Sequence, residues 1–199
     1  MNSAGAPATV RLDCRPRRNG KNLTFSYRLE NGSSTAIYIM DAYPWLDPQT
    51  QELRANDQTA VVVMHGEKEA VIGKLLPVAP MGRHIASPWF PLARRLQSGE
   101  AIERELNVPT PLAETSPLLG DLKLREYEVI ELEAVIFAIT YWIAGTPELY
   151  AAPESFAPDY LRVVARNSPG SAKLVWQRFQ VRDLQLFMRT DEINRTFVL

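Results

Sequence analysis

Hydrophobic and polar residues alternate along much of the chain. The clearest run is NLTFSYRLEN at residues 22–31, in which leucine and aromatic residues occupy every second position. A period of two places them on one face of a β-strand, with the polar residues on the other face. Residues 9–14 alternate in the same way, and the connecting sequence contains Asn19-Gly20, a strong hairpin signal. The pattern predicts an N-terminal β-hairpin, followed after a turn by a third strand at residues 36–42.

Other segments are rich in β-branched and aromatic residues and predict further strands. Two of them flank the polar sequence HGEKE and are typical of a second hairpin. The longest, at residues 127–143, predicts one bent strand or two strands with a break near Glu133. The further strands are expected at residues 59–64, 70–76, 101–108, 127–143, 172–181 and 184–188.

Helical signals are short. Residues 91–97 (PLARRLQ) and 158–164 (PDYLRVV) are interpreted as single helical turns, the second with Pro158 at its start. Proline is enriched, at 15 of 199 residues, which favours many ordered loops and few long helices. Long loops are expected at residues 41–58, 77–99, 109–121 and 145–159.

These elements predict one all-β domain. Hydrophobic residues make up 46% and charged residues 23% of the chain, as in ordinary globular proteins. Many short strands joined by turns indicate an antiparallel two-sheet sandwich. We expect residues 1–8 to form a flexible leader and residues 9–199 a single β-sandwich domain.

Two stretches carry a resemblance to a known architecture. The pattern LTFSYRLENGSSTAIYI at Leu23–Ile39 resembles the early strands of immunoglobulin-like domains in bacterial proteins. The turn Leu96–Glu100, which precedes an alternating strand, is similar to a later turn of those domains. The resemblance implies an immunoglobulin-like sandwich and no particular activity, because such domains host many functions. The Cys and Trp pair of antibody domains is missing, so immune-type recognition is not implied.

Charge and cysteine content narrow the function classes. The formal net charge is −1, which gives no bulk attraction to nucleic acid or to an anionic membrane. The basic residues around Asn19-Gly20 are therefore interpreted as a solvated hairpin tip. Cys14 is the only cysteine, which excludes an internal disulfide, and its place in the alternation predicts a buried thiol. No apolar run approaches the length of about 18 residues needed for a transmembrane helix.

Catalytic and cofactor motifs are not found in the sequence. There is no G-x-S-x-G, H-E-x-x-H, P-loop or G-x-G-x-x-G pattern. The two histidines, His65 and His84, and one cysteine do not complete a structural zinc site without carboxylates. Glu131 and Glu133 are interpreted as ordinary residues of one strand face rather than an acid–base pair. We therefore expect no enzyme activity, cofactor or metal.

Aromatic residues in the predicted loops are the most informative feature. Trp and Tyr bury much area at a low entropy cost, and proline orders the loops that carry them. Two interpretations stay open: the rings close the ends of the sandwich, or they form a binding surface. Trp142 and Trp176 lie on predicted strands and are expected in the core. The candidate binding residues are Tyr43, Trp45, Trp89, Phe90 and Tyr150.

The sequence predicts a non-enzymatic binding or assembly module that presents these loop aromatics to a protein partner. The alternative is a carbohydrate-binding or hydrolytic domain on a β-sandwich scaffold. A third hypothesis is a structural subunit that self-associates through exposed strand edges. The first residues lack the basic and apolar regions of a signal peptide. These residues leave two expectations open: a cytoplasmic protein, or a periplasmic or cell-envelope protein from which a signal peptide has been removed.

Overall fold

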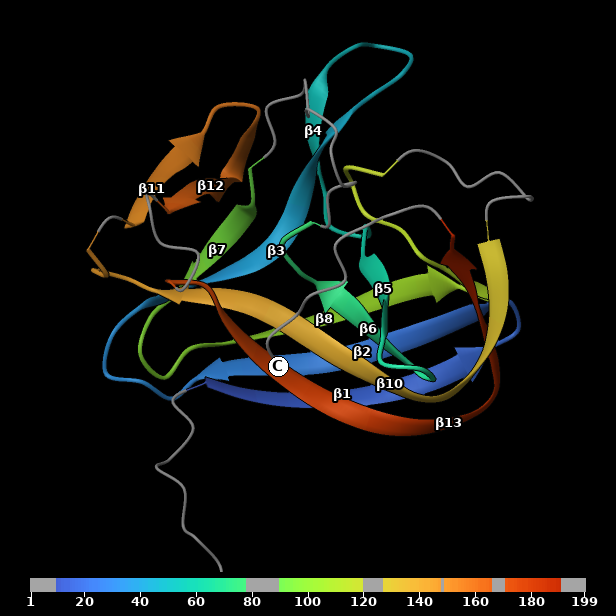
Figure 1. The fold of residues 1–199 in the computed structure, drawn as a ribbon. Helices are drawn as coiled ribbons and strands as arrows, with labels where there is room; N and C mark the ends of the chain where they lie inside the picture. Colours follow the sequence, from blue (N-terminus) through green and yellow to red (C-terminus); the bar gives the residue numbers. More distant parts are fainter. Residues whose placement is uncertain (1–9, 78–89, 120–126, 148, 166–170, 191–199) are drawn as a thin grey trace, which may run out of the picture.

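The computed structural model is a β-sandwich of two sheets (Figure 1) and describes residues 10–77, 90–119, 127–147, 149–165 and 171–190. Within these ranges the chain contains no α-helix. The prediction of an all-β sandwich is confirmed. The strands are β1 (Val10–Asn19), β2 (Asn22–Asn31), β3 (Ile37–Leu46), β4 (Leu53–Asn56), β5 (Val61–His65), β6 (Glu69–Lys74), β7 (Leu92–Leu96), β8 (Ala101–Pro109), β9 (Leu112–Ala113), β10 (Tyr127–Ile143), β11 (Leu149–Glu154), β12 (Ala157–Ala165) and β13 (Lys173–Arg189).

The small sheet has the order β1-β2-β8, and all of its pairings are antiparallel. The predicted N-terminal hairpin is confirmed: Asn19 pairs with Asn22, and Gly20 between them has a φ of 57°. This backbone conformation is one that glycine adopts without steric cost, which is why the turn forms there. The alternating apolar residues of β1, β2 and β8 point into the sandwich.

The large sheet has the order β11-β12-β7-β3-β10-β13-β9, with β6 and β5 attached beside β10. β10 is one bent strand, and its pairing with β13 shifts register between Leu132 and Ala134. The predicted irregularity near Glu133 is confirmed. The sheet also departs from the expected antiparallel pattern, because β6 pairs with β10 and β9 pairs with β13 in parallel. On one edge of β10, residues Tyr141–Ile143 pair with β3 and residues Ala134–Ile139 pair with β6.

Apolar side chains are buried on both faces of the large sheet. Between the sheets, Phe25 stacks on Phe137 with ring centroids 4.7 Å apart, and Tyr27 tilts against the same ring. On the outer face a second cluster surrounds Tyr43 and Trp142. Trp142 is 2% exposed, which confirms its predicted core position.

Trp176 is 46% exposed, so the prediction that it lies in the core is wrong. It lies on β13, where the side chains on either side of it in sequence, those of Val175 and Gln177, are partly buried and Trp176 itself is exposed. Alternation places Trp176 on the opposite face of the strand from these two neighbours. An aromatic residue on a strand is therefore not enough to predict burial.

The short helices predicted from sequence are also wrong. Residues 91–97 contain β7, and residues 158–164 lie within β12. The predicted loop at 145–159 contains most of the β11–β12 hairpin, and the one at 41–58 contains part of β3 and all of β4. These segments gain hydrogen-bonded neighbours from distant parts of the chain, such as β3 beside β7, and pairing of this kind overrides weak local preference. The proposed leader at residues 1–8 lies outside the described residues.

Candidate functional site

Tyr43 lies in the core, so its predicted position in a loop is wrong. Its side chain on β3 is 1% exposed. The Tyr43 Oη accepts a hydrogen bond from the backbone N–H of Leu75 at 3.0 Å and lies 2.8 Å from the Leu75 carbonyl oxygen, to which it donates. Burial raises the pKa of Tyr43 well above its ordinary value. Tyr43 is thus a structural anchor at the point where β3 leaves the body of the sandwich.

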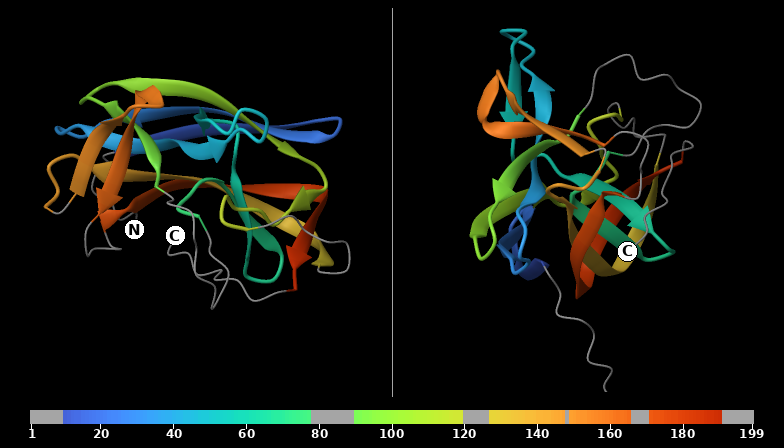
Figure 2. Two further views of the ribbon diagram at one scale, coloured as in Figure 1. Left: turned by 90° about the horizontal axis from the view of Figure 1, so that it is seen from above. Right: turned by 90° about the vertical axis from the view of Figure 1, so that its left-hand side faces the viewer.

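The distal half of β3 pairs with β4 and forms a two-stranded ribbon, which we call the arm (residues 43–56). Figures 1 and 2 show it projecting from the two sheets. Trp45 lies opposite Arg54, and Leu46 lies opposite Leu53. These three apolar side chains, Trp45, Leu46 and Leu53, are exposed by 43%, 50% and 44%. The arm therefore places large apolar groups in solvent on both of its faces.

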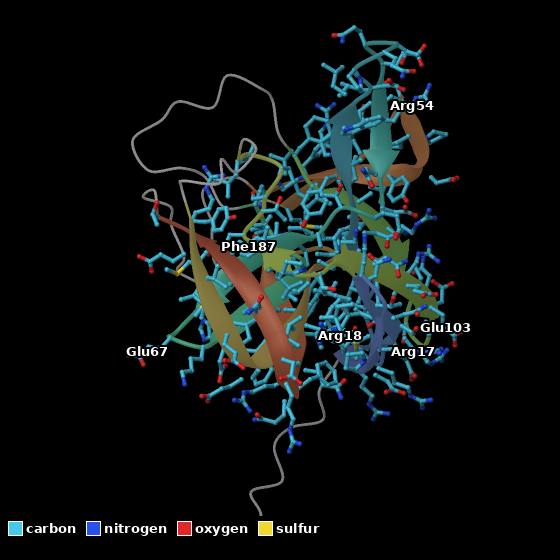
Figure 3. All side chains as sticks on the ribbon, turned by 90° about the vertical axis from the view of Figure 1, so that its right-hand side faces the viewer. Arg17, Arg18, Arg54, Glu67, Glu103 and Phe187 are labelled. Atoms are coloured by element: carbon cyan, nitrogen blue, oxygen red, sulfur yellow. The ribbon has the colours of Figure 1, made fainter. Side chains whose placement is uncertain are left out.

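The tip of the arm is ordered by polar contacts. Asp47 Oδ1 accepts hydrogen bonds from the backbone N–H groups of Gln49 and Thr50, at 2.9 and 3.3 Å. These bonds hold the pKa of the Asp47 carboxyl below its usual value. Arg54 reaches Asp47 at 3.7 Å and Glu52 at 3.2 Å (Figure 3 labels Arg54 on the arm). The carboxylate thus organises the turn that joins the two strands of the arm.

The β11–β12 hairpin carries one predicted aromatic residue, Tyr150, and contacts another, Phe90, which precedes β7. Tyr150 on β11 is 61% exposed. Phe90 is partly buried, and the Arg162 guanidinium lies 3.9 Å from its ring centroid. Glu154, itself buried, holds Arg162 through contacts of 2.7 and 2.6 Å to one carboxylate oxygen. Arg162 is therefore fixed between an acid and an aromatic face.

A small apolar cluster joins the arm to the β11–β12 hairpin. The right-hand view of Figure 2 shows the hairpin next to the arm, and the cluster has members on both. Trp45, Phe90 and Tyr150 therefore come from elements at one end of the molecule, whereas Trp89 lies outside the described residues. The cluster is formed by Ala42, Leu92, Ala157 and Tyr160, with Ala55, Phe90 and Phe156 packed against it.

Buried charges fix the base of the arm. Asp41 on β3 is 2% exposed, and its carboxylate contacts Arg94 on β7 at 2.7 Å and Arg104 on β8 at 3.6 Å. The Arg94 guanidinium lies 4.4 Å from the ring centroid of Tyr160, which belongs to β12. One carboxylate thus ties together strands of both sheets directly below the arm. The carboxylate is 2% exposed and already contacts both arginines, which indicates a structural role.

Lys74 is a second buried charge in the same region. Its Nζ donates to the backbone carbonyls of Asp57 and Thr59, at 2.5 and 2.7 Å, and lies 5.6 Å from the centroid of the Tyr43 ring. Removal from water lowers the pKa of Lys74 to about 8, against the opposing effect of nearby acids such as Asp41. A perturbed lysine is a candidate for chemistry. This one is 1% exposed and already donates to two carbonyls, so a substrate has no access to it.

The other candidate chemical groups are dispersed. Glu133 forms an ion pair of 2.6 Å with Lys68 on the surface. Cys14 is buried, and burial raises the pKa of its thiol to about 12, which keeps it unreactive. His65 ends β5, and His84 lies outside the described residues. Across the described ranges no three His, Cys, Asp or Glu side chains gather as a metal site would require.

Leu46 and Leu53 are surface residues that sequence reasoning missed. Neither leucine is aromatic, and only the aromatic residues of the predicted loops were expected to form a surface. The available signal was their symmetric placement around the polar sequence DPQTQE, which is consistent with a hairpin turn between two strands. The candidate surface therefore consists of Trp45, Leu46 and Leu53 on the arm, with Tyr150 on the neighbouring hairpin.

The structure contains no helix, in the parts of the chain that it describes, of the length and hydrophobicity that crossing a membrane requires. Comparison with protein-family models, with curated proteins and with solved structures finds no match to this chain.

Proposed function

We propose that the protein is a non-enzymatic binding module whose arm contacts a protein partner. The observation that carries this proposal is the concentration of exposed apolar side chains. Among the described residues, eight large hydrophobic side chains are exposed, and three of them, Trp45, Leu46 and Leu53, lie on the arm. Scattered exposed apolar residues are ordinary on a protein surface, whereas a projecting cluster marks an interaction site.

The arm has the mechanical properties of a binding element. Its base is anchored by Tyr43 and Asp41, and its tip is ordered by Asp47. Side chains presented on an ordered ribbon lose little conformational entropy on association, which leaves more of the apolar burial to appear as affinity. A partner that encloses the arm buries Trp45 on one face and Leu46 with Leu53 on the other, and Arg54 and Glu52 supply polar contacts at the rim.

Photo-crosslinking tests this proposal. A photoreactive amino acid is introduced at Leu53 in one preparation and at Val129 in a matched control, because Val129 is 53% exposed on β10, away from the arm. Each preparation is illuminated in lysate of the native host, and the adducts are identified by mass spectrometry. We expect a discrete adduct from position 53 and none of the same mass from position 129.

A double variant, Leu46→Asp with Leu53→Asp, makes the result quantitative. The adduct partner is purified, and its affinity is measured for the parent protein, for this variant and for Val129→Asp. We expect a loss of at least tenfold for the arm variant and no change for Val129→Asp. Equal binding by all three proteins would contradict the proposal. Tryptophan quenching by a panel of soluble glycans, lost in Trp45→Ala, would instead support the carbohydrate-binding alternative.

A further inference from the structure

Along β1, the backbone N–H and C=O groups of successive residues alternate between bonding to β2 and pointing away from the small sheet. The two-residue turn places Asn19 and Asn22 in a hydrogen-bonded pair, so the odd-numbered residues of β1 bond to β2. The N–H and C=O groups of the even-numbered residues then point away from the small sheet. The Cys14 N–H confirms this direction, because it donates at 3.0 Å to Gln177 Oε1 of β13.

The second half of this edge is protected. The Cys14 N–H is taken by Gln177, and Pro16 occupies an outward-pointing position without an N–H to donate. Further along, the Arg18 guanidinium donates to the backbone carbonyl of Asp183 at 2.9 Å. Proline and side-chain cover are the devices that natural sheets use to block strand addition.

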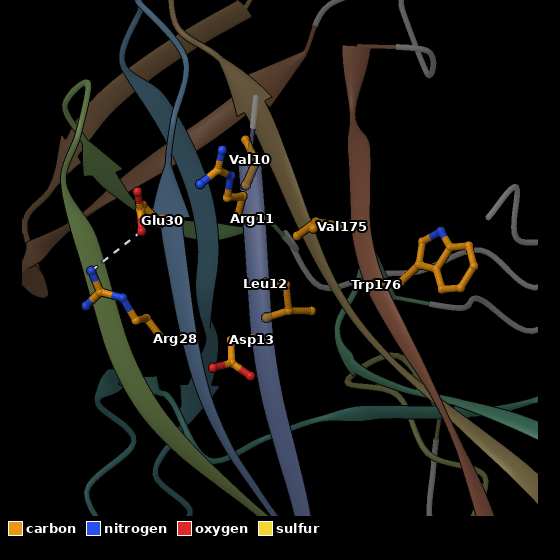
Figure 4. A pocket seen from close by; sticks show the side chains of 8 residues that line it. All are labelled: Val10, Arg11, Leu12, Asp13, Arg28, Glu30, Val175 and Trp176. Atoms are coloured by element: carbon orange, nitrogen blue, oxygen red, sulfur yellow. Dashed lines mark ion pairs between the residues drawn. The ribbon is translucent and has the colours of Figure 1, made fainter. Parts of the chain in front are cut away.

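The first half of the edge is open. A cleft of about 600 Å³ runs along Val10, Arg11, Leu12 and Asp13, and its far wall includes Val175 and Trp176 of β13 (Figure 4). The backbone groups of Val10 and Leu12 point towards the space in front of this edge. The described residues give these groups no hydrogen-bond partner. An edge with free donors and acceptors is a template for another strand.

We propose that this open edge pairs with the same edge of a second copy of the chain. The two β1 strands run antiparallel about a two-fold axis, with Leu12 opposite Leu12 of the second copy. The two Leu12 residues exchange two hydrogen bonds, and each Val10 exchanges two with Cys14 of the second copy across the axis. Six backbone bonds form, and the Val10 carbonyl replaces Gln177 Oε1 as the acceptor of the Cys14 N–H. The small sheets become one six-stranded sheet.

The charges on β1 favour this occupant and this register. Arg11 and Asp13 are exposed on the solvent face of the strand, two positions apart. With Leu12 on the axis, each Arg11 lies directly opposite Asp13 of the second copy, and two cross-strand ion pairs form. A register with Arg11 on the axis places two arginines opposite one another, which is destabilising. The register centred on Leu12 therefore pairs opposite charges, whereas the register centred on Arg11 pairs like charges.

The proposed contact is short, so the dimer is in concentration-dependent equilibrium with the monomer. It uses a different surface from the arm and is independent of the function proposed above. Sedimentation velocity over a wide concentration range at low ionic strength measures it directly. We expect a reversible shift from monomer to dimer that weakens as salt is added, because exposed ion pairs are screened.

Charge reversal tests the register. Arg11→Asp and Asp13→Arg each place like charges opposite one another, and each is expected to weaken the dimer about tenfold. The double variant, Arg11→Asp with Asp13→Arg, restores both pairs and is expected to recover the parent dissociation constant. Glu128→Arg, an exposed reversal on β10, is the control and is expected to leave the constant unchanged. Failure of the double variant to recover would overturn the register.

Removal of the backbone donor tests strand pairing itself. Leu12→Pro removes an outward-pointing N–H that does not bond to β2. The native strand already has a proline, Pro16, at an equivalent outward-pointing position. Circular dichroism checks its fold, and we expect a folded monomer. Independently, hydrogen exchange of the Leu12 and Val10 amides in the parent protein is expected to slow as concentration rises. A parent protein that stays monomeric throughout, or amide protection that does not change with concentration, refutes the proposal.

Discussion

The two halves of β3 have similar residues and opposite environments. Tyr43 and Trp45 are two positions apart on the same face of one strand, yet Tyr43 is 1% exposed and Trp45 is 43% exposed. Both residues pair with β4, Tyr43 opposite Asn56 and Trp45 opposite Arg54, so strand pairing does not separate them. Tyr43 is buried because its ring and hydroxyl pack against residues 73–75 at the end of β6, and Trp45 lies one step beyond that contact. Burial here follows contact with the body of the sandwich rather than the hydrophobicity of the residue.

The acids at the two ends of β3 show the same contrast. Asp41 is enclosed between two arginines of different sheets, and Asp47 binds the backbone of a solvent-exposed turn. The first contributes to the stability of the whole domain, because a buried ion that loses its partner is strongly unfavourable. The second shapes the arm only. The body and the arm should therefore respond differently to substitution.

The largest effect is expected in the body at Gly73. Its φ is 151°, a conformation that side chains rarely adopt, and an added Cβ would overlap the Ala138 carbonyl oxygen of β10. Gly73→Ala should lower the free energy of unfolding by about 5 kcal/mol or more, or abolish folding. Urea denaturation followed by circular dichroism measures this. A loss below about 1 kcal/mol would show that β6 does not pack against β10 as described.

The next largest effect is expected at Asp41. Asp41→Ala removes the buried acid that Arg94 and Arg104 share, and because these two side chains keep 30% and 33% of their surface in water, it should cost about 3 kcal/mol of unfolding free energy. Asp47→Ala is the matched control on the arm, where water replaces the lost contacts, and its denaturation midpoint should stay close to that of the parent. Equal losses in both variants would remove the distinction between body and arm.

Lys74 gives the body a pH dependence. Its folded-state pKa of about 8 lies below its ordinary value of 10.5. Between these values the unfolded chain holds a proton that the folded chain has released, so stability contributed by this group rises with pH. The slope approaches about 1 kcal/mol per pH unit, and the opposing ionisation of unfolded tyrosines sets in near pH 10.

Urea denaturation at pH 7, 8, 9 and 9.5 measures this slope. Lys74→Met is the comparison, because tyrosine ionisation affects both proteins alike and cancels in the difference. We expect the parent to gain stability relative to Lys74→Met as pH rises from 8. Parallel pH profiles would mean that Lys74 keeps its ordinary pKa in the folded state.

The smallest effect on stability is expected on the arm. Trp45→Ala should change the free energy of unfolding by less than about 1 kcal/mol, because the side chain is already exposed to solvent. Tyr43→Ala, two positions away, removes a buried ring and its hydrogen bonds and should cost about 3–5 kcal/mol. Thermal denaturation of the pair compares them. Similar costs would indicate that Trp45 packs against the body in solution.

Sequence reasoning predicted strands best where alternation was long and one face was buried. β2, β8 and the bend in β10 follow directly from their residues, because a period of two leaves one arrangement that buries the apolar face. It was wrong for β7 and β12, where short segments with proline near their starts suggested helical turns. Both are strands, since distant segments offer them pairing partners.

The candidate site was only partly predictable. The sequence drew attention to Trp45, Phe90 and Tyr150, and the structure brings their elements to one end of the molecule. It missed Leu46 and Leu53 and placed Tyr43 in a loop. Exposure at these positions depends on where β3 parts from β7 and β10, and local sequence does not encode the length of a neighbouring strand.

The sequence by itself determined an all-β chain, the N-terminal hairpin, the buried Cys14 and the faces of the most regular strands, because these follow from local periodicity and turn chemistry. The tertiary structure decided which strands are neighbours, that β6 joins β10 in parallel, that Trp176 faces solvent, and that half of β3 leaves the sheet as an arm. Those outcomes depend on contacts between residues far apart in the chain, where burial and hydrogen bonding outweigh local preference.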